Sequence, residues 1–144
     1  RPPPRRGNRR NMMAKPIHSM IRVLDETRAL AFYKAVFGME LRDRFDFESF
    51  SLIYLATDES PFELELTVNK GQETPYELGN GYGHLAFAVE DLEASHAAAK
   101  AAGYAPRDIV EFKPDGENIL AKFYFIADPD GYQIEVLQAG GRYR

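Results

Sequence analysis

The chain has 144 residues, of which 44% are hydrophobic, so it is long enough for one domain with a packed core. Cysteine is absent, which excludes disulfides and a thiol nucleophile, and no apolar run approaches the ~20 residues that a membrane-spanning helix needs. The formal net charge of -4 offers no basic excess for nucleic acid. We therefore expect a cytoplasmic protein that has neither a nucleic-acid partner nor a membrane anchor.

The start of the chain differs in composition from the rest. Residues 1–13 contain five arginines, three prolines and no acidic residue. This segment has no apolar core, so it is not a secretory signal, and its consecutive prolines do not fit an amphipathic helix. We expect residues 1–13 to be a disordered basic leader, with Met12 or Met13 as the natural start.

The first half of the chain predicts a strand, a helix and three more strands. Polar and apolar residues alternate over 17–24, as they do in a half-buried strand. Asp25 is a predicted N-cap, and Gly38 ends the apolar helical stripe that follows. The three strands that complete this half are expected near 40–47, 50–57 and 62–69.

The second half predicts the same order of elements. A strand over 83–90 precedes a helix over 92–102, which Asp91 caps and Gly103 ends. The turn signal Asp-Pro-Asp-Gly precedes the last strand. The three strands that follow this helix are expected near 104–112, 119–127 and 132–138.

The two halves are also similar in sequence, which indicates an internal repeat. His18 falls on His84 when the predicted helices are aligned, and Glu65 falls on Glu135 when FELEL is aligned with YQIEV. The fold class is therefore α+β, with two βαβββ modules. We expect a first module over 14–69, a linker over 70–82, a second module over 83–138 and a tail over 139–144.

Each module places one histidine and one glutamate on the same strand face. Because side chains alternate along a strand, His18 and Glu65 face away from the Ile, Leu and Val side of their strands, and His84 and Glu135 do the same. Each such residue alone is ordinary on a polar strand face, but all four recur at matched positions. Two imidazoles and two carboxylates suit a divalent transition metal, and they can leave positions open for water or substrate.

These residues lie in segments that resemble the glyoxalase I branch of the vicinal oxygen chelate superfamily. The resemblance covers nearly all of 15–138 and rests on the runs IHSMIRV, RALAFYKAVFGMEL, LELTVN, YELGNGYGHLA and DPDGYQIEV. It implies a vicinal oxygen chelate fold, in which the paired modules form a curved cup of mixed sheet that contains the metal. It also implies a homodimer, in which each metal takes His18 and Glu65 from one chain and His84 and Glu135 from the other.

The resemblance further implies an activity, the isomerisation of the methylglyoxal–glutathione hemithioacetal to S-lactoylglutathione through a metal-bound enediolate. One divalent metal is expected per site, with Ni or Co favoured and Zn possible. Glu135 matches the family's principal base, and Glu65 is the partner that serves the other face of the substrate or holds the metal.

Three further residues match family positions that contact glutathione. Arg22 and Asn69 each lie four residues after a predicted ligand on the same strand face, and Lys113 resembles the lysine of a mobile basic loop. The loop around Lys113 is longer than in short bacterial members, and its KPDG run resembles eukaryotic members more closely. The alternative interpretation of Lys113 is therefore an ordinary, solvated lysine of a loop.

Three alternatives on the same scaffold remain open at this point. A methylmalonyl-CoA epimerase-like enzyme has glutamine where this chain has Glu65, and an extradiol dioxygenase uses two histidines and one glutamate with Fe(II). A metal-free binding protein of the bleomycin-resistance type needs no ligands. The presence of all four candidate ligands favours the glyoxalase I reading over each of these.

Overall fold

The computed structural model describes residues 12–144, so residues 1–11 of the predicted leader lie outside the described part. The elements of the first module follow the predicted order. They are β1 (His18–Arg22), α2 (Glu26–Phe37), β2 (Glu40–Asp46), β3 (Phe50–Ala56) and β4 (Glu63–Asn69).

The second module repeats this order. Its elements are β5 (Leu85–Val89), α3 (Leu92–Ala101), β6 (Val110–Phe112), β7 (Ala121–Ala127) and β8 (Gln133–Gln138).

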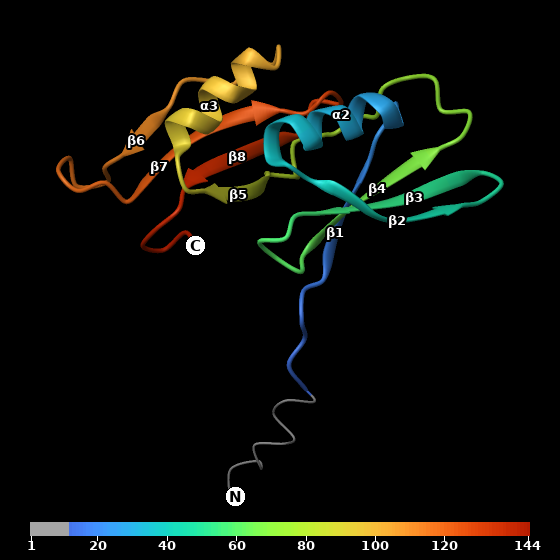
Figure 1. The fold of residues 1–144 in the computed structure, drawn as a ribbon, viewed down its shortest axis with the longest axis horizontal. Coiled ribbons are helices and arrows are strands. Elements are labelled where there is room, and N and C mark those ends of the chain that lie inside the picture. Colours follow the sequence, from blue (N-terminus) through green and yellow to red (C-terminus); the bar gives the residue numbers. More distant parts are fainter. Residues whose placement is uncertain (1–11) are drawn as a thin grey trace, which may run out of the picture.

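Each module forms one mixed sheet of four strands, and the two sheets have the same topology. The strand orders are β1-β4-β3-β2 and β5-β8-β7-β6. The first strand of each module runs parallel to the last, and the remaining pairs are antiparallel. Figure 1 shows one sheet on each side of the molecule, with α2 and α3 above them. This arrangement confirms the predicted α+β fold of two βαβββ modules.

Both helices begin where the sequence predicts, because an aspartate side chain caps each one. Asp25 accepts a hydrogen bond from the Arg28 backbone N–H at 2.9 Å, and Asp91 accepts one from the Ala94 backbone N–H at 3.0 Å. An acceptor at this position satisfies a backbone donor that has no partner within the helix. At the end of α2, Gly38 adopts φ 67°, the left-handed conformation that glycine takes without strain.

The predicted strand over 104–112 is the largest difference from expectation, because only residues 110–112 form strand β6. Pro106 lies in the preceding segment and has no backbone N–H for a sheet ladder. A single backbone hydrogen bond, from Arg107 N–H to the Phe125 carbonyl at 2.8 Å, fastens this segment to β7. The segment between α3 and β6 is therefore an irregular connection rather than a strand.

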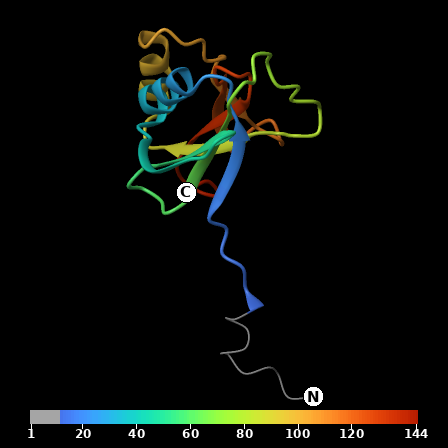
Figure 2. The same cartoon turned by 90° about the vertical axis from the view of Figure 1, so that its right-hand side faces the viewer.

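The two modules share one hydrophobic core, which lies between the helices and the sheets. Its buried residues come from both halves of the chain. Phe37 of α2 stacks on Phe87 of β5, with ring centroids 4.0 Å apart, and Phe32 contacts Tyr104 edge to face at 5.0 Å. Figure 2 shows α2 and α3 lying side by side on one side of the sheets. The opposite face of each sheet is left uncovered by any helix of the described residues.

A buried polar link also joins the modules. Tyr33 of α2 donates a hydrogen bond to Asp128 at 2.7 Å, 95 positions along the chain, and Asp128 also accepts from the backbone N–H groups of Asp130 and Tyr132. Asp130 in turn accepts from the Leu24 backbone N–H at 2.9 Å. The turn before β8 therefore contacts the β1–α2 connection at Leu24 and the middle of α2 at Tyr33.

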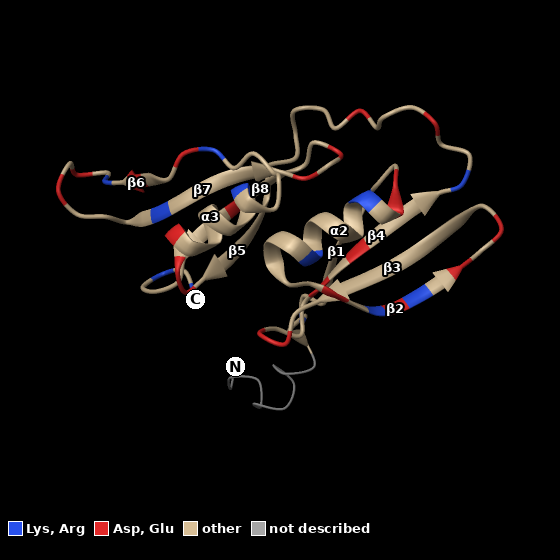
Figure 3. Ribbon diagram, turned by 45° about the horizontal axis from the view of Figure 1, so that its top comes forward, with Lys and Arg blue, Asp and Glu red and all other residues tan. Residues whose placement is uncertain are grey.

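The outer strand β2 is the most highly charged element of the first sheet. Its seven residues are all exposed, and basic and acidic side chains follow one another closely (Figure 3). Arg44 pairs with Glu26 of α2 and with Asp46. Charges on an edge strand discourage pairing with another chain, so this edge is protected. None of the helices within residues 12–144 is long and apolar enough to cross a membrane.

Candidate active site

The first predicted pair of ligands lies together on the uncovered face of the first sheet. Because β1 and β4 are neighbours in parallel register, the His18 ring reaches Glu65, and its Nε2 atom lies 2.9 Å from Glu65 Oε2. Glu65 is buried, with 8% of its surface exposed, although its neighbours Leu64 and Leu66 face the core. A nitrogen and a carboxylate oxygen thus point into one space.

The second predicted pair repeats this geometry on the other sheet. His84 precedes β5, Glu135 lies on β8, and the two strands are parallel neighbours. The His84 Nε2 atom lies 3.5 Å from Glu135 Oε1. Ile134 and Val136, which flank Glu135, are buried in the core. The alternation inferred from the sequence therefore places Glu135 on the uncovered face.

The four predicted ligands form two pairs rather than one cluster. Within residues 12–144, no group of three or more His, Cys, Asp or Glu side chains comes together so as to hold a metal ion. His18 and Glu65 belong to one sheet, whereas His84 and Glu135 belong to the other. One chain therefore provides two half-sites of identical donor chemistry.

An aromatic ring that the sequence analysis missed flanks each half-site. Tyr54 of β3 lies directly opposite Glu65 in the antiparallel register and contacts the His18 ring edge to face, with centroids 6.0 Å apart. Burial raises the pKa of Tyr54, and the nearby charge of Glu65 raises that pKa further.

Phe125 of β7 takes the same place in the second half-site. It lies opposite Glu135 and contacts the His84 ring edge to face at 5.2 Å. Tyr54 and Phe125 correspond in the structure, because each is two residues from the end of its strand, β3 or β7. The sequence alone would not have shown this, since the offset of 70 that aligns Glu65 with Glu135 places Tyr54 on Tyr124.

Two of the three predicted glutathione-binding residues lie beside the first half-site. Arg22, at the end of β1, is paired in register with Thr67, and Asn69 lies two residues further along the same neighbouring strand. The Asn69 side chain donates to the Tyr76 hydroxyl at 3.0 Å, which fixes its amide. Arg22 forms no ion pair with the side chains of residues 12–144, so its guanidinium stays available for an anion.

The third predicted residue, Lys113, lies elsewhere. It follows β6 in a turn of the second module, and its Nζ atom is 3.7 Å from a carboxylate oxygen of Glu111. Within one chain, therefore, the structure brings Arg22 and Asn69 together on the first module and places Lys113 on the second.

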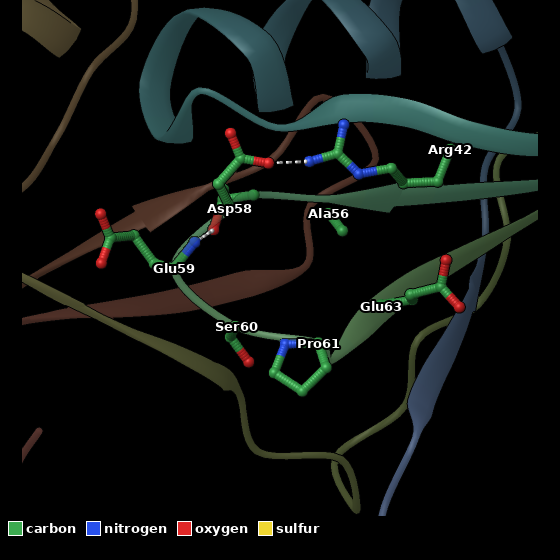
Figure 4. A pocket seen from close by; sticks show the side chains of 8 residues that line it. Arg42, Ala56, Asp58, Glu59, Ser60, Pro61 and Glu63 are labelled. Atoms are coloured by element: carbon green, nitrogen blue, oxygen red, sulfur yellow. Dashed lines mark hydrogen bonds and ion pairs between the residues drawn. The ribbon is translucent and has the colours of Figure 1, made fainter.

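Two hollows of the single chain contain none of these residues. Figure 4 shows the one at the β3–β4 loop, where Arg42 is already paired with Asp58 at 2.8 Å. A larger hollow, of about 1000 Å³, lies between the modules and is lined by β5, the end of α2 and the β3–β4 loop. Neither hollow is lined by a predicted ligand or by Arg22, Asn69 or Lys113. The predicted site residues thus lie on open sheet faces.

The model of the Glyoxalase/Bleomycin resistance protein/Dioxygenase superfamily matches residues 15–136. The chain belongs to this superfamily. The match spans both modules and includes both half-sites, so the whole repeat is the family unit.

Relatives of known name point to one branch of the superfamily. A lactoylglutathione lyase of Pseudomonas aeruginosa is 37% identical, and the match covers 85% of this chain and 81% of that protein. A lactoylglutathione lyase of Haemophilus influenzae is also 37% identical, over 85% of this chain and 90% of that protein. These relatives favour the lyase reading over the epimerase, dioxygenase and binding-protein alternatives.

Solved structures of similar fold carry the same indication. Glyoxalase I from Zea mays superposes with a TM-score of 0.78 and 30% sequence identity, over 88% of this chain and 45% of the maize chain. The trypanothione-dependent glyoxalase I of Leishmania major gives a TM-score of 0.70 and 31% identity, over 88% of this chain and 87% of that chain. The similar solved structures and the named relatives thus indicate the same branch of the superfamily, glyoxalase I.

Proposed function

We propose that this chain is a metal-dependent lactoylglutathione lyase, which isomerises the hemithioacetal of methylglyoxal and glutathione to S-lactoylglutathione. The observation that carries the proposal is the pair of matched His–Glu half-sites, in a chain whose named relatives are lactoylglutathione lyases. The reaction takes place in the cytoplasm.

The donor set fits a divalent metal. Each half-site supplies one imidazole nitrogen and one carboxylate oxygen, which together suit Ni²⁺, Co²⁺ or Zn²⁺. We favour Ni²⁺ or Co²⁺, because the chain resembles the short members of its family. His18, Glu65, His84 and Glu135 would hold the ion, and when bound it supplies Lewis acidity that makes the substrate C–H adjacent to its carbonyl more acidic.

A homodimer completes each site. Two donors from one sheet leave a metal undercoordinated, so a four-donor site needs a half-site of each kind. Strand β5 supports assembly at this place, since it is an edge strand with the wholly apolar sequence LAFAV and carries none of the charges that protect β2. In a two-fold dimer, His18 and Glu65 of one chain join His84 and Glu135 of the other, and two equal sites form.

Within such a site, the residues divide the work of proton transfer. Glu135 removes the proton from C1 of the hemithioacetal and returns it to C2, because its carboxylate contacts only His84 among the polar side chains of the described residues. Glu65 is buried more deeply and faces both His18 and Tyr54, so it serves as the fixed partner.

The polar end of the first module binds the thiol portion of the substrate. Arg22 supplies a cation for a glutathione carboxylate, and Asn69 supplies an amide held in place by Tyr76. Lys113 reaches the site only in the dimer, since it belongs to the module that carries Glu135. Arg22 and Asn69 lie on the module that carries Glu65, and Lys113 lies on the module that carries Glu135. In the proposed dimer, each site combines these two modules from different chains.

The test is complementation between two inactive chains. His18→Ala destroys one half-site and His84→Ala destroys the other, so each variant alone should lose its metal and its activity with methylglyoxal and glutathione. When the two are denatured together and refolded, a mixed dimer keeps one intact site if the sites are shared. We expect about a quarter of wild-type activity from random two-fold pairing.

The same experiment can reject the proposal. Recovery of no activity, while capture through an affinity tag on one variant shows that mixed dimers have formed, would exclude shared sites. Elemental analysis of the reloaded wild-type protein should find about one divalent ion per chain, since a two-fold dimer has two sites. A wild-type dimer without metal, or with metal but inactive on the hemithioacetal, would exclude the lyase assignment.

A further inference from the structure

The linker between the two modules turns sharply directly after β4. The Gln72 backbone N–H donates to the Asn69 carbonyl at 3.3 Å, which closes a four-residue turn over residues 69–72. Gly71, the third residue of this turn, adopts φ 88°, a conformation that glycine takes without strain. The linker therefore does not continue in the direction of β4 but bends at the residue that follows the strand.

The bend brings a linker side chain onto a predicted substrate contact. The half-buried Tyr76 lies seven positions after Asn69, and its hydroxyl oxygen accepts a hydrogen bond from Asn69 Nδ2 at 3.0 Å. The other polar atom of this amide, Asn69 Oδ1, accepts no hydrogen bond from residues 12–144. One end of the amide is thus held by the linker, and the other end is available to a ligand.

The second module has no counterpart of this arrangement. The offset of 70 that aligns Glu65 with Glu135 places Asn69 on Ala139, which carries no amide. The chain after Ala139 forms a short turn in which Gly140 and Tyr143 pair through their backbones. The linker therefore adds its hydroxyl only to the sheet face that also carries Arg22.

Such a bond has a consequence for ligand binding. An asparagine amide that has no partner rotates, so it presents either its N–H groups or its oxygen to a ligand. The bond to Tyr76 holds the amide in one orientation before a ligand arrives, and preorganisation of this kind lowers the entropic cost of binding. Because Nδ2 is turned toward Tyr76, Oδ1 remains to accept a hydrogen bond from an N–H group of the ligand.

We propose that Tyr76 is a positioning residue, whose hydroxyl orients the Asn69 amide for the thiol portion of the substrate and so makes the linker between the modules part of the thiol site. This inference rests on the proposed lyase function, and it assigns a role in substrate affinity to a segment that otherwise only joins the modules. The proposed contact of Tyr76 is with Asn69 and not with the substrate.

The first test removes the hydroxyl and measures ligand affinity without turnover. S-methylglutathione, which cannot form the hemithioacetal, is titrated calorimetrically into the metal-loaded protein. Tyr76→Phe should raise its dissociation constant about threefold to tenfold, the range expected for one lost hydrogen bond. Tyr104→Phe is the matched control, because its ring packs on Phe32 in the core between the modules, and its affinity should equal that of the wild type.

The second test asks whether Tyr76 acts through Asn69. In a double-mutant cycle, Tyr76→Phe should change the affinity of Asn69→Ala for S-methylglutathione by less than about twofold, because the amide that it orients is already gone. In turnover of the hemithioacetal, Tyr76→Phe alone should raise KM about threefold to tenfold and change kcat by less than about twofold. A packing role would instead leave the losses of the two single variants independent, so that they multiply.

Two results would overturn this inference while leaving the lyase assignment intact. One is a native affinity for S-methylglutathione in Tyr76→Phe, and the other is a double variant in which the two single losses multiply. Failure of the proposed function is distinguishable from both, because the wild-type protein and Tyr104→Phe would then neither bind S-methylglutathione nor turn over the hemithioacetal.

Discussion

The first and second modules have the same fold and the same His–Glu pair, yet the surroundings of the two pairs differ. Where the first module has Arg22, four residues after its histidine, the second has Ala88. Where the first has Asn69, four residues after its glutamate, the second has Ala139. The uncovered face of the first sheet is therefore the polar one, and that of the second sheet is apolar around its ligands.

This difference indicates how a duplicated scaffold acquires an asymmetric site. The histidine and the glutamate occupy the same register positions in both modules, and under the proposed function a change to either would remove a metal ligand. The neighbouring residues differ, so that the first module offers cation, amide and phenol groups where the second has alanine and phenylalanine. A two-fold dimer would join unlike half-sites, so each site would receive both kinds of surroundings.

The largest expected effect separates the two glutamates. Glu135→Gln should lose about 10²–10⁴ in kcat at full metal occupancy, because an amide cannot accept the C1 proton. Glu65→Gln should lose less, since its oxygen can still approach the metal. The measurement is kcat with metal content checked in each variant, together with solvent deuterium uptake at C2. If Glu65→Gln were instead the inactive variant, the roles of the two modules would have to be exchanged.

The next effect concerns stability, and it compares corresponding loops of the modules. Asp128→Ala leaves the buried Tyr33 hydroxyl and two partly buried backbone N–H groups without this acceptor, so we expect a loss of about 2–4 kcal/mol in unfolding free energy. Asp58, in the first module's β3–β4 loop, is exposed and pairs only with Arg42, so Asp58→Ala should cost less than about 0.5 kcal/mol.

Urea unfolding at one fixed protein concentration measures this difference, because the proposed dimerisation would make apparent stability depend on concentration. Equal losses for the two aspartate variants would show that the buried link between modules adds nothing to the fold.

A smaller effect tests the polar face of the first module. Arg22→Ala should raise KM for the glutathione hemithioacetal about tenfold, with kcat changed by less than about threefold, because a charge-assisted contact to a carboxylate is lost. Asn69→Ala should act in the same direction but more weakly, since an amide carries no charge. Steady-state kinetics with glutathione and with a thiol that lacks carboxylates provide the measurement, and an equal response to both thiols would contradict the assignment.

The smallest effect is a pH dependence. Burial raises the pKa of Asp128 above its ordinary value, although the bond from Tyr33 opposes this. The folded state therefore binds the proton more tightly than the unfolded state, for which the pKa is about 3.9. The contribution of Asp128 is largest below that value and is lost as the pH rises through the higher folded pKa.

The neutral variant Asp128→Asn should lack this dependence. Relative to that variant, the wild type should gain stability when the pH falls from 7 toward 4. Urea midpoints of both proteins across this range measure the gain, with Asp58→Asn as the exposed control. A stability difference between wild type and Asp128→Asn that stays constant with pH would show that Asp128 does not titrate differently in the folded protein.

The sequence by itself determined the features that depend on local order along the chain. The alternation of side chains is enough to place His18, Glu65 and Glu135 on the polar faces of their strands, and the capping aspartates mark both helix starts. The internal repeat shows that the βαβββ unit occurs twice. These features need only neighbours within a few residues, or two similar segments compared side by side.

Only the tertiary structure decided which of these residues meet. Strand periodicity predicts which face a residue lies on, but the position of Tyr54 opposite Glu65 depends on the register between β3 and β4. The bond from Tyr33 to Asp128 depends on how the modules pack together. The separation of the four donors into two pairs has the same origin, because strand pairing joins β1 to β4 and β5 to β8 within each sheet and leaves the sheets apart. Contacts between residues far apart in sequence follow from packing and strand register, which no local pattern encodes.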